Sequence, residues 1–168
     1  QGAEVIKVES PGLGDMMRYL GSQKNGITGI YALHNRGKKS LVVDLKKPEG
    51  TEVLRSLVTN ADVLIQNFRP GAVERLGFGY EDVKAINPNI VYVSIAGFGA
   101  DGPSSNRRVY DNVIQAASGL ASVQTDAATG KPAIFKHLIC DKVTAYTVAQ
   151  AITAALFARE RGAGGQHI

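Results

Sequence analysis

Short apolar runs alternate along this chain with stretches in which apolar residues recur at helical spacing. The runs with the length and β-branched content of buried strands are residues 5–8, 40–45, 62–68 and 90–99. After the second run, Pro48 suits the first turn of a helix, which continues with apolar residues at Val53, Leu54, Leu57 and Val58. Residues 70–89 contain one or two short helices. This alternation predicts βαβ units, and therefore an α/β fold with an open, mainly parallel sheet and flanking helices.

Two further segments have a less regular pattern. Residues 21–39 are polar and glycine-rich, which predicts a long loop. Residues 110–123 predict one helix with Val113, Ala117 and Leu120 on one face, and residues 126–132 predict a turn.

The last long segment predicts a helix that begins near Asp141. Its apolar stripe consists of Val148, Ile152 and Leu156. Small alanines lie between these residues and allow close approach, so we expect burial on more than one side. The helix ends in RERGAGG, with basic residues in its last turn and glycine beyond, and residues 164–168 open a new strand.

Composition narrows the class of protein. With 168 residues and 44% hydrophobic content, the chain can bury the core of one domain. A single cysteine excludes a disulfide framework and fits a reducing cytoplasm. The histidines, at positions 34, 137 and 167, show no ligand spacing, so we expect no metal. The longest apolar run lies in the last helix and is interrupted by Gln150 and Thr153, which leaves it short of a membrane span.

The net charge of +4 suits an anionic ligand but is too weak to indicate nucleic-acid binding. Basic residues cluster at positions 36–47 and at Arg107 and Arg108. Such clusters form either a solvated loop surface or a phosphate-binding site, and composition leaves both readings open.

The glycines at positions 97, 99 and 102 match G-x-G-x-x-G after a predicted strand. A dinucleotide site requires this loop to open directly into a helix, whose N-terminus meets the pyrophosphate. Here the glycines continue into PSSNRR, which does not suit the first turns of an apolar-faced helix. The nicotinamide enzyme is therefore the weakest of the alternatives.

Asn67 and Phe68 lie where a predicted parallel strand ends and a helix begins, at the edge where open α/β sheets bind ligands. Phe68 could stack on a flat ring of a ligand, and the Asn67 amide could form a hydrogen bond to the edge of that ring. The alternative is a plain turn with Phe68 in the core, and position alone does not decide between them.

Two acidic residues precede predicted helices. Asp111 follows Tyr110 and is expected to cap its helix. Asp141 has the same structural interpretation. However, the partial positive charge of a helix N-terminus favours an ionised carboxylate, which on a partly dry surface can attack an activated acyl carbon. Tyr110 could be an active-site phenol.

Several blocks carry a family resemblance in their order and spacing: GAEVIKVESPGLGD, NRGKKSLVVDLKKPEG, ADVLIQNFRPGAVERLGFGYEDV, NPNIVYVSIAGFGADGP, YDNVIQAASGL and ALFARERGAGGQHI. Together they resemble the class III CoA-transferase family (CaiB/BaiF type), typified by formyl-CoA transferase and carnitine CoA-transferase. The resemblance implies the Rossmann-like large domain of that family. The chain begins without methionine and the family's members are longer, so we expect residues 1–168 to be one α/β domain piece, incomplete at both ends and without the smaller second domain.

The resemblance implies a covalent mechanism. The family's catalytic aspartate falls on Asp141, whose carboxylate would attack the thioester of an acyl-CoA to give a mixed anhydride. The released CoA thiolate would then form an aspartyl-CoA thioester, from which an acceptor carboxylate takes the CoA. Coenzyme A thus enters as a substrate, and Tyr110 would be the second active-site residue.

The family's CoA-binding positions fall on two sets of residues. One is the stretch Val43, Asp44, Leu45 and Lys46, expected near the adenine. The other comprises Asn67, Phe68, Arg75 and Arg108, where cations would meet phosphates and an aromatic ring would cover the cofactor. Ser10 departs from formyl-CoA transferase, which has an arginine there.

The resemblance leaves alternative functions. Racemases of the family carry histidine where this chain has Tyr110, which favours transfer over racemisation. A CoA-ester isomerase and a non-catalytic CoA-binding remnant remain alternatives. Family members form interlocked homodimers. A piece without the remaining strands has a bare sheet edge and an uncovered acyl pocket, so activity is expected of the longer protein.

Overall fold

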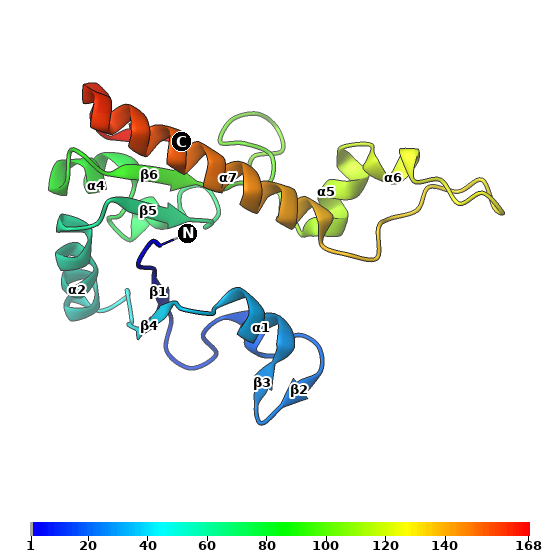
Figure 1. The fold of residues 1–168 in the computed structure, drawn as a ribbon, viewed down its shortest axis with the longest axis horizontal. Coiled ribbons are helices and arrows are strands. Elements are labelled where there is room, and N and C mark those ends of the chain that lie inside the picture. The colour runs from blue at the N-terminus through cyan, green and yellow to red at the C-terminus, as the bar shows by residue number, and fades with distance from the viewer. Residues whose placement is uncertain (1) are drawn as a thin grey trace. The chain divides into compact units, whose positions relative to one another are not determined.

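The computed structural model describes residues 2–168, which divide into two compact units at Leu57 and Val58 (Figure 1). Both units combine helices with parallel strands, which confirms the α/β class. The expectation that the whole chain is a single domain stays a prediction. No helix in the described part of the chain has the length and apolar character that crossing a membrane requires.

The first unit contains a parallel strand pair. β1 (Ile6–Glu9) pairs with β4 (Lys39–Val42), with Ile6 opposite Lys39 and Glu9 opposite Val42. Both predicted strands are confirmed, but the predicted burial of the first is wrong. Val5 and Ile6 are each 41% exposed, and the residue of this strand that is buried is the acidic Glu9, which is 5% exposed.

The predicted loop over residues 21–39 is wrong, because the segment contains a hairpin and a helix. β2 (Gln23–Lys24) pairs antiparallel with β3 (Ile27–Thr28), and α1 (Gly29–His34) follows at once. Asn25 and Gly26 both have positive φ, 53° and 77°, as a tight two-residue hairpin turn requires. The Thr28 side chain accepts a hydrogen bond from the Tyr31 N–H at 3.1 Å and caps the helix.

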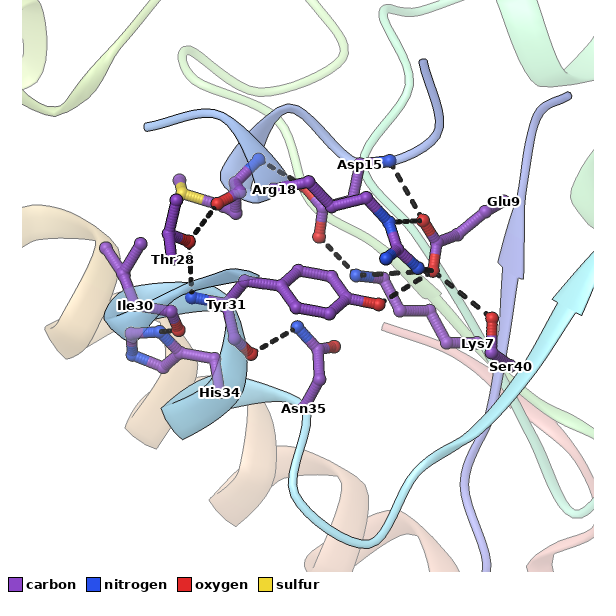
Figure 2. Close-up of polar contacts among 11 residues, drawn as sticks. Lys7, Glu9, Asp15, Arg18, Thr28, Ile30, Tyr31, His34, Asn35 and Ser40 are labelled. Atoms are coloured by element: carbon purple, nitrogen blue, oxygen red, sulfur yellow. Dashed lines mark hydrogen bonds and ion pairs between the residues drawn. The ribbon is translucent and has the colours of Figure 1, made fainter. Parts of the chain in front are cut away.

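The buried carboxylate of Glu9, in β1, accepts hydrogen bonds from the segment of Asp15 and Arg18, from α1 and from β4 (Figure 2). The Arg18 guanidinium, in η1 (Met16–Arg18), donates from Nε and Nη2 to its two oxygens at 2.9 Å each. The Asp15 N–H donates at 2.9 Å and the Tyr31 hydroxyl at 3.1 Å, while Lys7 pairs with the Asp15 carboxylate. The bidentate bond from Arg18 lowers the pKa of Glu9 to about 2, against the opposing effect of burial.

The helix expected after Pro48 is α2 (Pro48–Thr59), which leads from the first unit into the second. Its start lies tight against the preceding loop, because a Cβ on Gly50 would come within 2.0 Å of the Asp44 carbonyl oxygen. Gly50 therefore marks a position where the backbones meet without room for a side chain.

The second unit contains the parallel order β5 (Val63–Gln66), β6 (Val91–Ser94), β7 (Gln166–His167). The third and fourth predicted strands are confirmed, as is the strand expected at residues 164–168. The two short helices expected between β5 and β6 are α3 (Ala72–Arg75) and α4 (Tyr80–Ile86).

The long last helix is α7 (Ile139–Ala158), which continues into η2 (Arg159–Ala163) and runs along β6 (Figure 1). The predicted stripe is confirmed, because its members pack on a core of Val91, Val93 and Ala155. Burial on more than one side is wrong. The side of α7 away from this core exposes large apolar residues, at Val143, Tyr146 and Phe157.

The single helix predicted over residues 110–123 is wrong, because the segment forms α5 (Asp111–Ala117) and α6 (Leu120–Val123). Gly119 between them has a φ of 82°, which ends the first helix. The buried face also differs from the predicted one. Val113 is 40% exposed, whereas the polar Asp111 and Gln115 are 4% and 1% exposed.

The depressed pKa of Glu9 predicts a pH-dependent stability. Since its pKa falls from the ordinary 4.5 to about 2 on folding, this group stabilises the fold above pH 4.5 and the effect is lost as pH falls towards 2. At neutral pH it contributes about 3 kcal/mol. We expect Glu9→Gln to lose that amount and the associated pH slope in urea unfolding. The control is Glu52→Gln on the exposed side of α2, and equal slopes in both variants would contradict the prediction.

Gly165 predicts a second stability effect. A Cβ there would lie 2.5 Å from the Pro88 carbonyl oxygen and 2.6 Å from that of Ile90, where β7 joins β6. We expect Gly165→Ala to destabilise the second unit by about 1–3 kcal/mol through overpacking, measured by chemical denaturation. Gly29→Ala is the matched control, because its Cβ would meet nothing within 4 Å. Equal stability of the two variants would count against this account.

Candidate functional site

The carboxyl ends of β5 and β6 form one edge of the sheet in the second unit. The Ile95 N–H donates to the Gln66 carbonyl oxygen at 2.9 Å, which continues the ladder to the last residues of both strands. Asn67 and Phe68 leave the sheet here and are exposed, with Phe68 48% exposed. The interpretation that places Phe68 in the core is therefore wrong, and its ring is available at the edge where open α/β sheets bind ligands.

The long loop after β6 returns to the same edge. A Cβ on Gly97 would lie 2.2 Å from Cγ2 of Val109, so the two residues are in direct contact and Gly97 has no room for a side chain. This contact brings Arg108 and Tyr110, one on each side of Val109, back to the end of β6. Both are exposed, and Tyr110 is 68% exposed. The glycines from Gly97 onwards lead into turns rather than a helix, as expected, so the loop lacks the helix that a dinucleotide site requires.

Asp111 lies directly after Tyr110, at the first position of α5. Its role as a cap of its own helix is wrong, because its carboxylate caps a different one. Oδ2 accepts a hydrogen bond from the Asp141 N–H at 3.0 Å, in the first turn of α7. Burial by itself would raise the pKa of Asp111, but hydrogen bonds from the Gln115 amide and from the N–H groups of Asp141 and Cys140 outweigh it and lower the pKa.

Gln115 holds the segment that leads into α7. It is 1% exposed and donates from Nε2 to Asp111 Oδ1 and to the His137 carbonyl oxygen, the latter at 3.1 Å. Its Oε1 accepts the Phe135 N–H at 2.8 Å. A buried amide of this kind must satisfy both its donors and its acceptor, and Gln115 does so with α5 and with the backbone before α7.

Asp141 is the third residue of α7 and is exposed. Among the described residues, no donor forms a hydrogen bond that shifts the pKa of its carboxylate. The sequence argument expected the helix end to favour the ionised form. The pKa of Asp141 is instead raised, because partial desolvation and the nearby Asp111 carboxylate outweigh the opposing charge of Lys142. Among the described residues, the site thus pairs a buried carboxylate that accepts several hydrogen bonds with an exposed carboxylate whose pKa no hydrogen bond shifts.

The neighbouring thiol is poorly suited to act as a nucleophile. Burial, together with the charges of Asp111 and Asp141, raises the pKa of Cys140. Thiolates rather than thiols attack carbonyl carbons, so at neutral pH Cys140 is in its less reactive form.

The other predicted binding residues lie in two places. Arg75, in the last turn of α3, is exposed, and its Nη1 lies 3.1 Å from the position a Cβ on Gly71 would take, so the guanidinium folds back over the start of that helix. The stretch Val43, Asp44, Leu45 and Lys46 belongs to the first unit, between β4 and α2. There Asp44 Oδ1 accepts the Lys46 N–H at 3.0 Å, which closes a tight turn. The Lys46 side chain is exposed on this turn.

A cavity of about 160 Å³ in the first unit contains none of the predicted site residues. It is lined by basic and polar side chains, among them Lys7, Tyr31, Lys38, Lys39 and Ser40. Lys7 is paired with Asp15, and Lys39 donates to Glu4 at 2.7 Å, so acidic side chains already neutralise much of its charge. This reduces its suitability for an anion. In the described part of the chain, no three acidic, histidine or cysteine side chains gather closely enough to hold a metal ion.

The sequence reasoning missed Gln115 and gave Asp111 the wrong role. A weak signal was available for both. They stand four residues apart at helical spacing, so they share one face of α5, and polar residues on a helix face that meets a neighbouring element point to a hydrogen-bonded contact.

Comparison with known proteins places these residues in a family. The model of CoA-transferase family III matches residues 1–168. The formyl-CoA:oxalate CoA-transferase of Afipia carboxidovorans is 40% identical over 168 residues, covering 99% of this chain and 39% of that protein. The succinate–glutarate CoA-transferase of Agrobacterium fabrum is 40% identical over 174 residues, covering 99% of this chain and 43% of that protein.

Solved structures show the same similarity in three dimensions. A CAIB/BAIF family protein from Brucella suis superposes with a TM-score of 0.90 at 41% identity, over 99% of this chain and 45% of that one. Rv3272 from Mycobacterium tuberculosis gives a TM-score of 0.89 at 37% identity, over 99% of this chain and 46% of that one. The chain therefore spans about two fifths of the length of the curated relatives it matches.

The raised pKa of Cys140 predicts slow alkylation. We expect its reaction with iodoacetamide, followed by mass spectrometry of the Cys140 peptide, to reach half its maximal rate at a higher pH in the folded than in the urea-unfolded protein. Asp111→Asn should lower the folded midpoint, because it removes one of the charges that oppose the thiolate. A folded midpoint at or below the unfolded one would contradict this.

Proposed function

The chain belongs to CoA-transferase family III, and on this premise we propose that the protein moves coenzyme A from an acyl-CoA donor to a carboxylic acid acceptor through an aspartyl-CoA thioester on Asp141. The observation that carries the proposal is the state of the Asp141 carboxylate. It is exposed, and its pKa is shifted by burial and charge rather than by a hydrogen-bond donor. It stands in a helical turn in which Asp111 accepts the N–H groups of Cys140 and Asp141. An exposed carboxylate whose pKa is shifted by no hydrogen bond from the described residues can attack a carbonyl carbon.

The reaction would proceed by two symmetrical exchanges. An oxygen of Asp141 attacks the thioester carbonyl carbon and the C–S bond breaks. The CoA thiolate departs, and a mixed anhydride of Asp141 and the donor acid is formed. The thiolate then attacks the side-chain carbonyl carbon of Asp141, which releases the donor acid and forms the aspartyl-CoA thioester. The acceptor carboxylate attacks this thioester, and the CoA thiolate finally takes the acceptor acyl group and frees Asp141. The overall reaction replaces one thioester by another of similar energy and changes no oxidation state, so no external oxidant or energy source is needed.

The raised pKa of Asp141 affects this chemistry in two ways. A more basic carboxylate is a better nucleophile towards the thioester carbon and a poorer leaving group once the anhydride has formed. The group must nevertheless be ionised to react, and the raised pKa moves the loss of activity on acidification to a higher pH than an ordinary aspartate would show. The charge of Lys142 opposes the shift.

CoA binding would draw on the remaining predicted residues. The exposed Phe68 ring and the Asn67 amide would meet the flat or amide-bearing parts of CoA, and the guanidinium groups of Arg75 and Arg108 would meet its phosphates. Tyr110, together with Arg108, would lie beside the pantetheine arm, as the family resemblance implies. The loop at Val43, Asp44, Leu45 and Lys46 would contact the adenine. These assignments rest on family resemblance together with exposure.

The cellular compartment and the oligomeric state are inferred from the same resemblance. We propose that it works in the cytoplasm as a homodimer whose subunits interlock. A lone cysteine in the chain fits a reducing compartment.

Trapping the covalent intermediate tests the proposal. The full-length protein is incubated with an acyl-CoA donor and then with hydroxylamine, and peptides are analysed by mass spectrometry. We expect a hydroxamate at Asp141, and about a thousand-fold or greater loss of CoA transfer in Asp141→Asn. Cys140→Ala is the matched neighbour control and should keep both label and transfer.

The alternative functions give different results in the same experiment. Exchange of the α-proton of the acyl group with solvent, without label at Asp141, would indicate a CoA-ester isomerase or racemase. Absence of both label and exchange, in a protein that CoA still stabilises thermally, would indicate a binding remnant. Either result would overturn the proposed function.

A further inference from the structure

We propose that Asp111 is a positioning residue for the chemistry at Asp141, acting together with Gln115 as a buried latch between α5 and the start of α7. The inference rests on the proposed function of Asp141. It concerns a residue to which the family comparison assigns no role, and it is carried by contacts within the second unit.

The latch controls the position of the first turn of α7. The helix has no side-chain cap of its own, since its N-cap residue is the apolar Leu138. The Asp111 carboxylate supplies the missing acceptor, at 3.0 Å from the Asp141 nitrogen. Gln115 ties Asp111 to the segment before the helix through the His137 carbonyl oxygen and the Phe135 N–H. The backbone of Asp141 is thus held from α5.

The latch also supplies the cap of the first turn of α7. An acidic residue at the third position of a helix commonly folds its carboxylate back onto the N–H of the N-cap residue. Here Asp111 accepts from the N–H groups of Cys140 and Asp141, and among the described residues no backbone hydrogen bond shifts the pKa of the Asp141 carboxylate. The exposed Asp141 oxygens can therefore be presented to a substrate.

A third effect is electrostatic. The charged groups that act on Asp141 are the Asp111 carboxylate from α5 and Lys142 in its own helix. The Cys140 thiol beside it is titratable but neutral at neutral pH, and His137 acts on Asp111 from the preceding segment. The negative charge of Asp111 disfavours ionisation of Asp141 and makes its carboxylate more basic. Removing that charge therefore lowers the pH at which Asp141 ionises.

The main test is Asp111→Asn in the full-length protein. We expect kcat for CoA transfer to fall about 10- to 100-fold, while KM for the acyl-CoA changes less than about three-fold, because the variant misplaces the nucleophile without touching the cofactor contacts. The rate of hydroxamate labelling at Asp141 should fall with kcat. The acid limb of the pH profile of kcat should move to lower pH.

A second readout does not need turnover. A water-soluble carbodiimide modifies protonated carboxyl groups, so the pH midpoint of Asp141 modification, followed by mass spectrometry, reports its ionisation. We expect this midpoint to be lower in Asp111→Asn than in the wild type. A residue that served only the stability of the fold would change the melting temperature but would leave this midpoint in place.

Two further variants complete the design. Asp126→Asn is the matched control, because the Asp126 carboxylate also accepts backbone N–H groups, those of Ala128 and Thr129 at 2.9 and 2.8 Å, in a turn at the surface. It should leave kcat and the Asp141 midpoint unchanged. Asp111→Ser keeps a capping oxygen without the charge, and replaces Asp111→Asn in both measurements if that variant does not fold.

The outcomes separate this inference from the proposed function. If the wild type gives no label at Asp141, the proposed function fails, and a positioning role for Asp111 fails with it. If the wild type is labelled but Asp111→Asn keeps kcat within about two-fold and an unshifted midpoint, only the inference about Asp111 is overturned. Slower labelling together with a lowered midpoint supports both.

Discussion

The start of a long helix leaves backbone N–H groups without partners, and in this protein a carboxylate from another helix satisfies them. Asp111 is 4% exposed and would be costly to bury as an anion without donors. The first turn of α7 and the Gln115 amide supply those donors. This one set of hydrogen bonds connects α5 to the backbone of Asp141 in the first turn of α7 and to the chain before that helix.

The same rule governs the first unit. Glu9 is also buried, and Arg18, Asp15 and Tyr31 donate to its oxygens from different segments (Figure 2). Both buried carboxylates have lowered pKa values because their donors favour the charged form. Asp141 differs in being exposed, with a pKa that partial burial and the charge of Asp111 raise against the opposing charge of Lys142. The contrast separates carboxylates that hold the structure together from one that is available for reaction.

Much of the fold was predictable because the relevant signals are local. Apolar runs correctly located β1, β4, β5 and β6, and helical spacing located α2 and the core-facing stripe of α7. The errors have physical causes. The hairpin at Asn25 and Gly26 was not predicted, because its strands are short and lie in a polar segment. A consecutive Asn-Gly pair is nevertheless a turn signal. The helix expected over residues 110–123 breaks at Gly119, and its buried face is polar because it meets the N–H groups of α7 rather than an apolar surface.

The sequence by itself determined the strand and helix periodicity, the family, and the candidate residues, since these depend on residue type and order along the chain. Tertiary structure alone decided which carboxylate is buried and which is exposed. Asp111 and Asp141 look alike in the sequence, each acidic and each at the start of a helix. Their roles differ because a hydrogen bond between residues 30 positions apart depends on how the two helices pack, and no local pattern encodes that distance.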